Sequence, residues 1–512
     1  MPRHFPFHIS HFAFRIFLIA FVALRATAAD EPSKDVASLP TAASVVRVNS
    51  TNQAWNFDRP WLKRPPFTRR GIGVVIEGGR VLVTAETIAN HTYVELERPG
   101  NSEKIPAVIE RVDYESNLAL LKPQDPKFLD GTVPVSLAKS VQVGAKLNVL
   151  QLETTGAAAF TPATVTTVTV GGYPADGIAL LIYRVSAPLQ YRDNSFTVPV
   201  FHGDKLAGLL MRYDSRSQSA DLVPEGVISN FLARADKQPY NGISRAGITF
   251  SPTRDPQFRR YLGMKKDQTG IYVVSIAHGG SAEKAGLKQG DVVLRVNGYD
   301  IDEDGNYPNP DYGKIPFSHL ISTARLPGGE ILLRVLRDGK VVDLQLPLEP
   351  RDPSKIISEP YVLDHAPRYY ILGGLVFQEL SRAYLREWGS DWKTDAPARL
   401  IYLDEFQDEL PADRGRIVFL NDILPADTSV GYDDVDQVVV QKINGRVIKS
   451  LDDVAEAVKH PVNGFHKIEL ESDPGVLYLD AKQTADTAEE LRKSYDLPAL
   501  DNLNDPETKV AP

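Results

Sequence analysis

A run of alternating aspartates in the middle of the chain has the spacing of a cation-binding loop. Asp300, Asp302 and Asp304 are followed by Gly305, which matches the first half of a calcium loop, and Asp311 falls at its twelfth position. However, two prolines interrupt the segment, and the bidentate glutamate that usually closes such a loop is absent. We therefore predict no cofactor and no metal, and we keep calcium at the three aspartates as the less favoured alternative.

The composition excludes several classes of site and partner. The chain has 512 residues and no cysteine, so disulfides, thiol nucleophiles and cysteine metal sites are impossible. Hydrophobic residues make up 43% of the chain, which is typical of a globular protein with several cores. The formal net charge is −9 with both signs spread along the chain. Because phosphate binding needs a basic face, nucleic acid is not expected as a partner.

The most specific pattern lies at residues 281–298, SAEKAGLKQGDVVLRVNG. It predicts a short helix that ends at Gly286, where a residue without Cβ takes the left-handed conformation easily. Leu287 then packs into the core, and alternating apolar residues from Val292 predict a strand. The segment resembles the PDZ domains of HtrA/Deg proteins. The resemblance implies a groove that binds the C-termini of peptides or unfolded proteins.

In PDZ domains a peptide adds as a strand to a sheet edge, and backbone N–H groups of a loop hold its carboxylate. The loop that resembles this cradle comes at the start of the unit, and a helix expected over 317–326 supplies residues at i, i+3 and i+4 for the opposite wall or the core beneath it. The predicted peptide-binding residues are Ala246, Gly247, Ile248, Thr249, Phe250, Phe317, Leu320 and Ile321.

The resemblance extends to both sides of this unit. Residues 71–236 carry short β-rich runs, with hairpin turns expected at Gly78-Gly79 and Gly203-Asp204 and a short helix expected over 225–235. The region looks like the trypsin-like barrel domain that precedes PDZ domains in HtrA/Deg proteases. The third unit opens with YILGGLVF at 370–377 and resembles the second PDZ-like domain of the plant-type Deg branch. DVVLRVNGYDI (291–301) and DQVVVQKINGRVI (436–448) each run into Asn-Gly, which predicts a duplicated module with a diverged second copy. The fold class is therefore predicted to be mainly β with α+β modules, a trypsin-like double β-barrel followed by two PDZ-like domains.

The chain departs from the family where its chemistry should be. Thr87, Asn117 and Ser195 occupy the positions of the catalytic histidine, aspartate and serine. One residue is extra between Ser195 and Pro199, so an alignment on the proline puts Phe196 at the serine position instead. A serine hydroxyl is a poor nucleophile without a base, and neither threonine nor asparagine can act as that base or its charged partner. No catalytic residue is expected.

Two alternatives to this inactive barrel stay open. His91 and His202, the histidines of the barrel region, are interpreted as surface residues, although either could serve as a rearranged base for an active serine endopeptidase built on Ser195. The other alternative is a structural role in assembly, since barrels of this family commonly form homo-oligomers. The favoured hypothesis is a pseudoprotease that binds protein termini as a scaffold, chaperone or regulator.

The chain begins with an expected export signal. Arg3 precedes the apolar run IFLIAFVAL at 16–24, and Ala26-Thr27-Ala28 has the small residues of a cleavage site. The run is too short to span a bilayer, so we predict an exported protein, periplasmic or extracellular, with no stable membrane insertion. The predicted order is signal peptide (1–28), N-terminal arm (29–66), degenerate protease domain (67–238), first PDZ domain (242–350), linker (351–367), second PDZ-like domain with a C-terminal helix (368–500) and polar tail (501–512).

Overall fold

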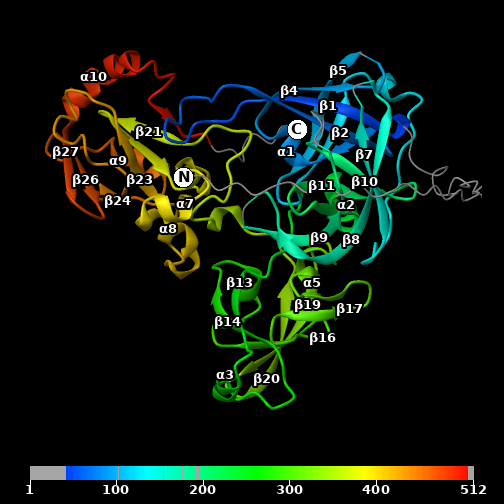
Figure 1. Cartoon of the computed structure of the whole chain (residues 1–512). Coiled ribbons are helices and arrows are strands. Elements are labelled where there is room, and N and C mark those ends of the chain that lie inside the picture. The colour runs from blue at the N-terminus through cyan, green and yellow to red at the C-terminus, as the bar shows by residue number, and fades with distance from the viewer. Residues whose placement is uncertain (1–41, 102, 154, 176, 191–195, 505–512) are drawn as a thin grey trace, which may run out of the picture. The chain divides into compact units, whose positions relative to one another are not determined.

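The computed structural model describes residues 42–504, apart from 102, 154, 176 and 191–195 (Figure 1). The predicted signal peptide and Ser195 lie outside the described residues, so both stay predictions. Within the described part of the chain, no helix has the length and apolarity to cross a membrane.

The first module is a closed six-stranded barrel, blue in Figure 1, with the strand order β1-β2-β3-β6-β5-β4. Gly78 and Gly79, both with positive φ, form the predicted turn between the second and third strands. A one-turn helix, α1 (Ala85–Ile88), follows the third strand. The strands are β1 (Val45–Asn52), β2 (Phe67–Ile76), β3 (Arg80–Val83), β4 (His91–Glu97), β5 (Lys104–Asp113) and β6 (Leu118–Pro123).

The extended arm expected over 29–66 is wrong for residues 45–52, which form β1 and pair with both β2 and β4. The polar residues in this segment concealed the strand. Ser50 and Asn52 are fully buried, and the Asn52 amide donates to the backbone carbonyls of Thr87 and Ala89 at 3.2 and 2.8 Å. These two bonds satisfy the buried NH2 group of Asn52 inside the closed barrel.

The second module is also a closed barrel, with the order β10-β11-β12-β9-β8-β7. The predicted Gly203-Asp204 turn joins its fourth and fifth strands. The predicted helix over 225–235 is confirmed as α2 (Glu225–Ala235), which buries Val227, Ile228 and Phe231 on one face. The strands are β7 (Lys146–Leu152), β8 (Ala158–Gly172), β9 (Ala179–Ser186), β10 (Val198–His202), β11 (Lys205–Asp214) and β12 (Ser219–Pro224).

The third module, green in Figure 1, is a sheet with the order β13-β14-β15-β19-β20, in which β13 is an edge strand. Its predicted helix–turn–strand is confirmed, because α4 (Ser281–Lys284) is followed by Gly286 at φ +73°. The helices are α3 (Pro256–Tyr261), α4 and α5 (His319–Ser322). The strands are β13 (Ile248–Pro252), β14 (Ile271–Ile276), β15 (Val292–Val296), β16 (Tyr299–Asp300), β17 (Asn306–Asn309), β18 (Gly313–Pro316), β19 (Glu330–Arg337) and β20 (Lys340–Pro347).

The helix expected over 317–326 is too long, because α5 is a single turn. Ile321 and Thr323 are β-branched and lower helix propensity here. In addition, the Thr323 carbonyl accepts a hydrogen bond from the Asn230 side chain of α2 at 2.6 Å, which replaces a bond within a longer helix.

The fourth module, yellow to red in Figure 1, is a sheet with the order β27-β26-β24-β23-β22-β21-β28. The polar tail expected from residue 501 is wrong at its start, since Asp501 and Asn502 form β28 and pair with β21. The helices are α6 (Arg382–Leu385), α7 (Trp392–Asp395), α8 (Ala398–Glu405), α9 (Leu451–Ala457) and α10 (Ala481–Ser494). The strands are β21 (Tyr369–Leu372), β22 (Leu375–Glu379), β23 (Val418–Ile423), β24 (Val438–Ile443), β25 (Arg446–Val447), β26 (Phe465–Leu470) and β27 (Val476–Asp480).

The third and fourth modules share a local structure that their sequences also share. DVVLRVNGYDI (291–301) and DQVVVQKINGRVI (436–448) each run along a central strand into an Asn-Gly turn. Asn297 and Asn444 have φ of +51° and +52°, and each turn returns into a two-residue strand, β16 or β25. The predicted duplication is consistent with this match of backbone conformation and strand pairing.

Candidate functional site

The position that the sequence predicts for the catalytic histidine is filled by a buried cluster of threonines. Thr87, at the end of the turn after β3, is fully buried, as are Thr84 and Thr197. The Thr84 hydroxyl lies 3.0 Å from that of Thr87 and 2.6 Å from that of Thr197, and the last two hydroxyls are 2.5 Å apart. Three neutral hydroxyls that satisfy one another leave no group at this position that can accept a proton from a serine.

Asn117, at the predicted position of the aspartate, has a structural role. It is 1% exposed and adopts φ +54°, a conformation that asparagine tolerates better than most residues. Its side-chain oxygen accepts from the Glu86 N–H at 3.0 Å, and its amide donates to the Glu86 carboxylate at 3.2 Å. Asn117 therefore holds the first turn of α1, and its neutral side chain faces a glutamate.

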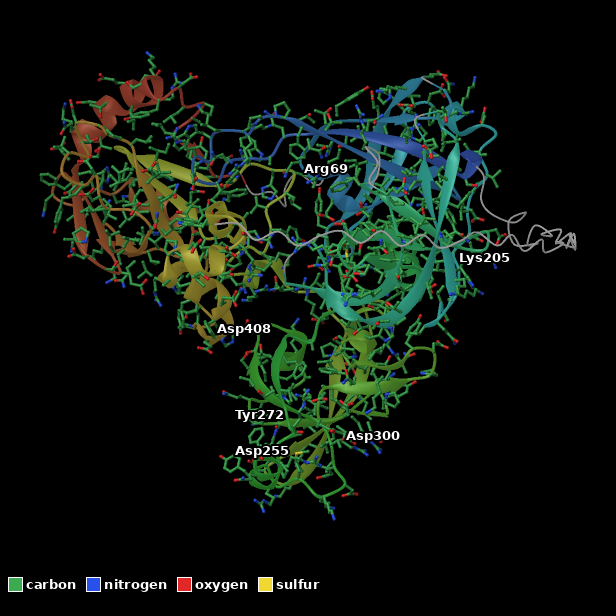
Figure 2. The ribbon with its side chains drawn as sticks, viewed as in Figure 1. Arg69, Lys205, Asp255, Tyr272, Asp300 and Asp408 are labelled. Atoms are coloured by element: carbon green, nitrogen blue, oxygen red, sulfur yellow. The ribbon has the colours of Figure 1, made fainter. Side chains whose placement is uncertain are left out.

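Arg69 and Phe196 lie beside this region, and Arg69 is labelled in Figure 2. The Arg69 guanidinium stands 4.7 Å from the centre of the Phe196 ring and donates to the Glu86 backbone carbonyl. Burial raises the pKa of Glu86, although Arg69 and Asn117 act in the opposite direction. Phe196, the alternative residue at the serine position, therefore forms a cation–π contact with Arg69.

The two barrel histidines do not gather with these residues. The His91 ring faces the Ile88 carbonyl at 3.1 Å and Asp364 at 3.8 Å, and its hydrogen bond to Asp364 raises its pKa. Asp364 belongs to the linker after the first PDZ module, where it also accepts from the Asn90 backbone N–H at 2.7 Å. His202 is exposed at the end of β10. His91 therefore contacts Asp364 of the linker.

The region predicted to bind peptides contains a cavity of about 590 Å³. Six of the eight predicted residues line it, while Thr249 and Leu320 do not. Phe250, 38% exposed on the edge strand β13, packs edge-on against Phe317 with ring centres 5.5 Å apart. The lining predicted residues are Ala246, Gly247, Ile248, Phe250, Phe317 and Ile321, and Leu320 belongs to the core beneath.

The loop predicted to form the backbone cradle contains a glycine in the left-handed region of backbone conformation. Gly247 has φ +70°, and a Cβ on it would meet the Ala277 Cβ at 3.3 Å. The carbonyls of Ala246 and Gly247 accept from the N–H groups of Ala282 and Ala277, both at 2.9 Å. These bonds fix the loop against α4, so the predicted cradle is rigidly placed at the end of the edge strand.

Sequence reasoning missed the remaining walls of the cavity, because they come from other parts of the chain. One wall belongs to the second barrel, one to the segment after β20, and one to the fourth module. The missed lining residues include Gly177, Ile178, Ala179, Arg245, Arg351, Lys355, Arg382, Asp404, Gln407 and Asp408. Asp408 is labelled in Figure 2. A cavity assembled from four segments has no contiguous sequence signal.

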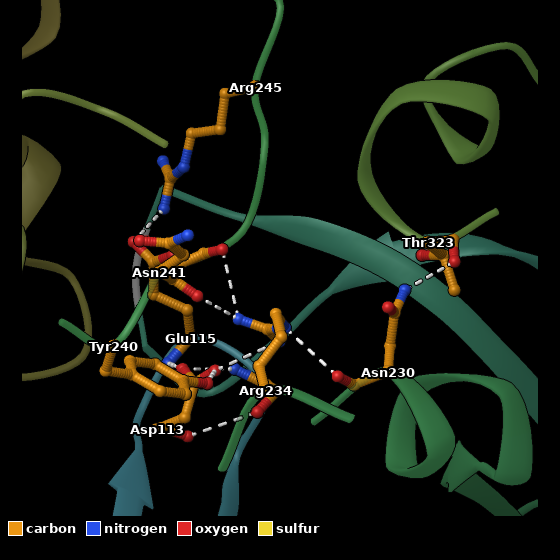
Figure 3. Close-up of polar contacts among 10 residues, drawn as sticks. Asp113, Glu115, Asn230, Arg234, Tyr240, Asn241, Arg245 and Thr323 are labelled. Atoms are coloured by element: carbon orange, nitrogen blue, oxygen red, sulfur yellow. Dashed lines mark hydrogen bonds and ion pairs between the residues drawn. The ribbon is translucent and has the colours of Figure 1, made fainter. Parts of the chain in front are cut away.

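A buried ion pair between the two barrels also holds the segment that leads into the third module (Figure 3). Arg234, at the end of α2, is 3% exposed and lies 3.5 Å from Asp113, which is also buried. The Arg234 guanidinium donates to the backbone carbonyls of Asn241 and Gly242 at 2.6 and 3.0 Å, and Tyr240 donates to Asp113 at 2.5 Å. The pair therefore fixes the segment that leads into the cradle.

The three aspartates of the calcium-like run each have a cation of their own. Asp300 pairs with Arg295 and Asp304 with Arg254, while Asp302 lies 3.3 Å from the Lys314 ammonium. In a calcium loop the carboxylates turn toward one shared centre. Within the described residues no group of three or more His, Asp or Glu side chains is placed to hold a metal ion.

The buried His319 in α5 is expected to make the stability of the protein depend on pH. Asn309 donates to the Tyr307 hydroxyl at 2.7 Å, and that hydroxyl lies 2.6 Å from Nδ1 of His319, which fits a neutral ring that accepts the bond. Burial lowers the pKa of His319 to about 4.

The sign of this effect follows from proton uptake. Between pH 6.5 and about 4 the unfolded chain binds a proton that the folded chain does not. The free energy of unfolding therefore decreases by about 3 kcal/mol as the pH is lowered through this range. His319→Phe should remove this part of the loss. The measurement is the melting temperature of both proteins from pH 7 to pH 4.5, and two parallel curves would contradict the prediction.

Comparison with known proteins places these modules in a family. PDZ domain models match residues 241–303 and 359–501. Protease Do-like 4, mitochondrial, of Arabidopsis thaliana is 25% identical over 455 residues, which cover 88% of this chain and 83% of that protein. Protease Do-like 2, chloroplastic, of the same plant is 25% identical over 465 residues, covering 89% and 74%.

Solved structures of the same family are also similar. The HtrA-type protease AlgW with decapeptide matches 62% of this chain and 98% of its own, at 17% identity and a TM-score of 0.45. The fold follows from the topology of this chain itself, in which two closed barrels of six strands precede two PDZ sheets. With similarity to Do-like proteases along most of its length, the chain belongs to the HtrA/Deg family of trypsin-like proteins with PDZ domains.

Proposed function

We propose that this chain is a non-catalytic HtrA/Deg protein that binds the C-terminal segments of other proteins in the groove of its first PDZ domain. The observation that carries the proposal is the buried threonine cluster at the histidine position. Loss of the base and of its charged partner typically lowers serine protease activity by several orders of magnitude. The groove, by contrast, depends on a sheet edge and a backbone loop that are intact.

The catalytic half of the proposal is tested by long incubation of the full-length protein with unfolded casein. We expect no cleavage by the wild type beyond that of Ser195→Ala. Equal trace cleavage in both proteins would indicate a contaminating protease and agree with the proposal. Turnover in the wild type that disappears in Ser195→Ala would overturn it and establish the alternative, an active endopeptidase at Ser195.

The binding half is tested with fluorescent decapeptides that end in valine with a free carboxylate. A valine end is chosen because Ile248, Phe250 and Phe317 make the groove apolar. We expect saturable binding that Gly247→Val abolishes, since the new side chain crowds the cradle. Gly339→Val is the matched control, because Gly339 also has positive φ, at +73°, but has open space around its Cα. Equal loss in both variants, or no binding by the wild type, would reject a groove site.

A further inference from the structure

The cradle of the first PDZ domain lies beside two arginines with different surroundings. The Arg245 guanidinium is engaged by the barrels, where it pairs with Glu115 at 2.5 Å and donates to the Gly177 carbonyl at 2.6 Å. Arg351, in the segment after β20, has a neutral partner instead, the side-chain oxygen of Gln407 at 2.6 Å. In the described part of the chain no carboxylate lies within ion-pair distance of Arg351.

Arg351 is a half-buried cation whose charge is only partly compensated. Burial lowers its pKa, and the neighbouring Arg245 lowers it further, while Asp408, Glu359 and Glu115 act through space in the opposite direction. A buried charge without a bonded counter-ion is unfavourable, and an anion that binds next to it recovers that free energy. The environment of Arg351 thus favours a negatively charged ligand.

Three other acidic groups of the cavity do not cancel this preference, because they are paired elsewhere, and Asp352 accepts from the hydroxyl and the backbone N–H of Ser354 at 2.7 and 2.9 Å. Asp404 forms an ion pair with Arg382 at 2.8 Å, and Asp413 with the Lys449 ammonium at 2.9 Å. Glu405 lies 2.6 Å from the ammonium of Lys393.

The backbone places Arg351 against the cradle. The Arg245 N–H donates to the Glu349 carbonyl at 3.0 Å, two residues before Arg351. Four residues beyond it, the Lys355 side chain packs on Gly279 so closely that a Cβ there would meet it at 3.0 Å. Since Gly247 in turn contacts the turn at Ala277 and Gly280, the segment 349–355 crosses the end of the groove where a peptide terminates.

We propose that Arg351, held in place by Gln407 of the second PDZ domain, binds the terminal carboxylate of a peptide in the groove of the first. The proposal rests on the proposed peptide-binding function and deepens it. It makes recognition of a free C-terminus a joint property of the two PDZ domains, in which the first supplies the edge strand and the second positions the cation. Arg351 is the carboxylate-binding residue, and Gln407 is a positioning residue.

The test measures the affinity of the full-length protein for two decapeptides that end in valine, one with a free carboxylate and one as the amide. In the wild type, amidation should raise Kd about tenfold, as expected for the loss of a charged hydrogen bond. The Arg351→Gln variant should bind the free acid about as weakly as it binds the amide. Its Kd for the amide should equal that of the wild type. Gln407→Leu should give an intermediate ratio, and Arg351→Lys should retain part of it.

Lys340→Gln is the matched control, because it removes a positive charge from an exposed lysine of the same PDZ domain that does not line the cavity. It should keep the tenfold ratio between the two peptides. If Arg351→Gln weakens both peptides equally, or leaves the ratio at tenfold, Arg351 does not bind the carboxylate, although peptide binding itself stands. If the wild type binds neither peptide, the proposed function fails together with this inference.

Discussion

Replacing Arg234 with methionine is expected to lower the free energy of local unfolding around α2 by about 3 kcal/mol. Arg234 and Asp113 are 3% and 4% exposed at their side chains, so removal of the cation leaves a buried carboxylate without its counter-ion. The carbonyls of Asn241 and Gly242 also lose their donor. Methionine keeps the length and the apolar contact with Tyr240, which isolates the loss of charge and hydrogen bonds.

Hydrogen exchange of the α2 amides in the full-length protein is the appropriate measurement, because a multidomain chain need not unfold in one step. Arg111→Met is the matched control, since Arg111 stacks on the same Tyr240 ring but is less buried. It should change protection much less. The double variant Arg234→Met with Asp113→Asn should lose less than the sum of the two single variants, because the neutral amide leaves no unpaired charge. Additive losses would show that the two residues do not interact energetically.

Replacing Asp291 with alanine should destabilise the first PDZ domain by about 3 kcal/mol. Asp291, in the Gly-Asp turn of the 281–298 motif, is 1% exposed. Its carboxylate accepts two bonds from Arg337, at 2.7 and 2.6 Å, and one from the Lys288 N–H at 2.8 Å. The variant therefore removes three charge-assisted bonds from a site that water does not reach.

The same sheet contains a second Arg–Asp pair, Arg334 and Asp343, which is much more exposed than the pair of Arg337 and Asp291. Arg334 donates two bonds to Asp343, at 2.8 and 2.9 Å, but both side chains are 40% exposed or more. Because exposed ion pairs are screened by water, Asp343→Ala should have little effect. Protection of the β15 and β19 amides against hydrogen exchange compares the two variants directly. Similar losses in both would mean that burial of Asp291 does not set the strength of its ion pair.

The sequence alone determined those features that a few neighbouring residues encode. The helix at 281–284 with its left-handed Gly286, the turn at Gly78-Gly79 and the helix over 225–235 lie where the pattern predicts them. In each case the signal is a glycine that favours positive φ or a periodic spacing of apolar residues, and it lies within a few neighbouring residues. The six groove-lining residues were found in a different way, from the resemblance of the 246–250 loop to PDZ domains and from the helical spacing that begins at Phe317.

Only the tertiary structure decided the rest of the site. Thr197 meets Thr84 and Thr87 across more than a hundred residues of chain, and Gln407 reaches Arg351 across 56. The strand at 45–52 looks polar in sequence, yet the NH2 group of its buried Asn52 donates to carbonyls that only the folded barrel supplies. Local propensity cannot report such contacts, because each polar group there is stabilised by a distant partner whose position depends on how all the modules pack.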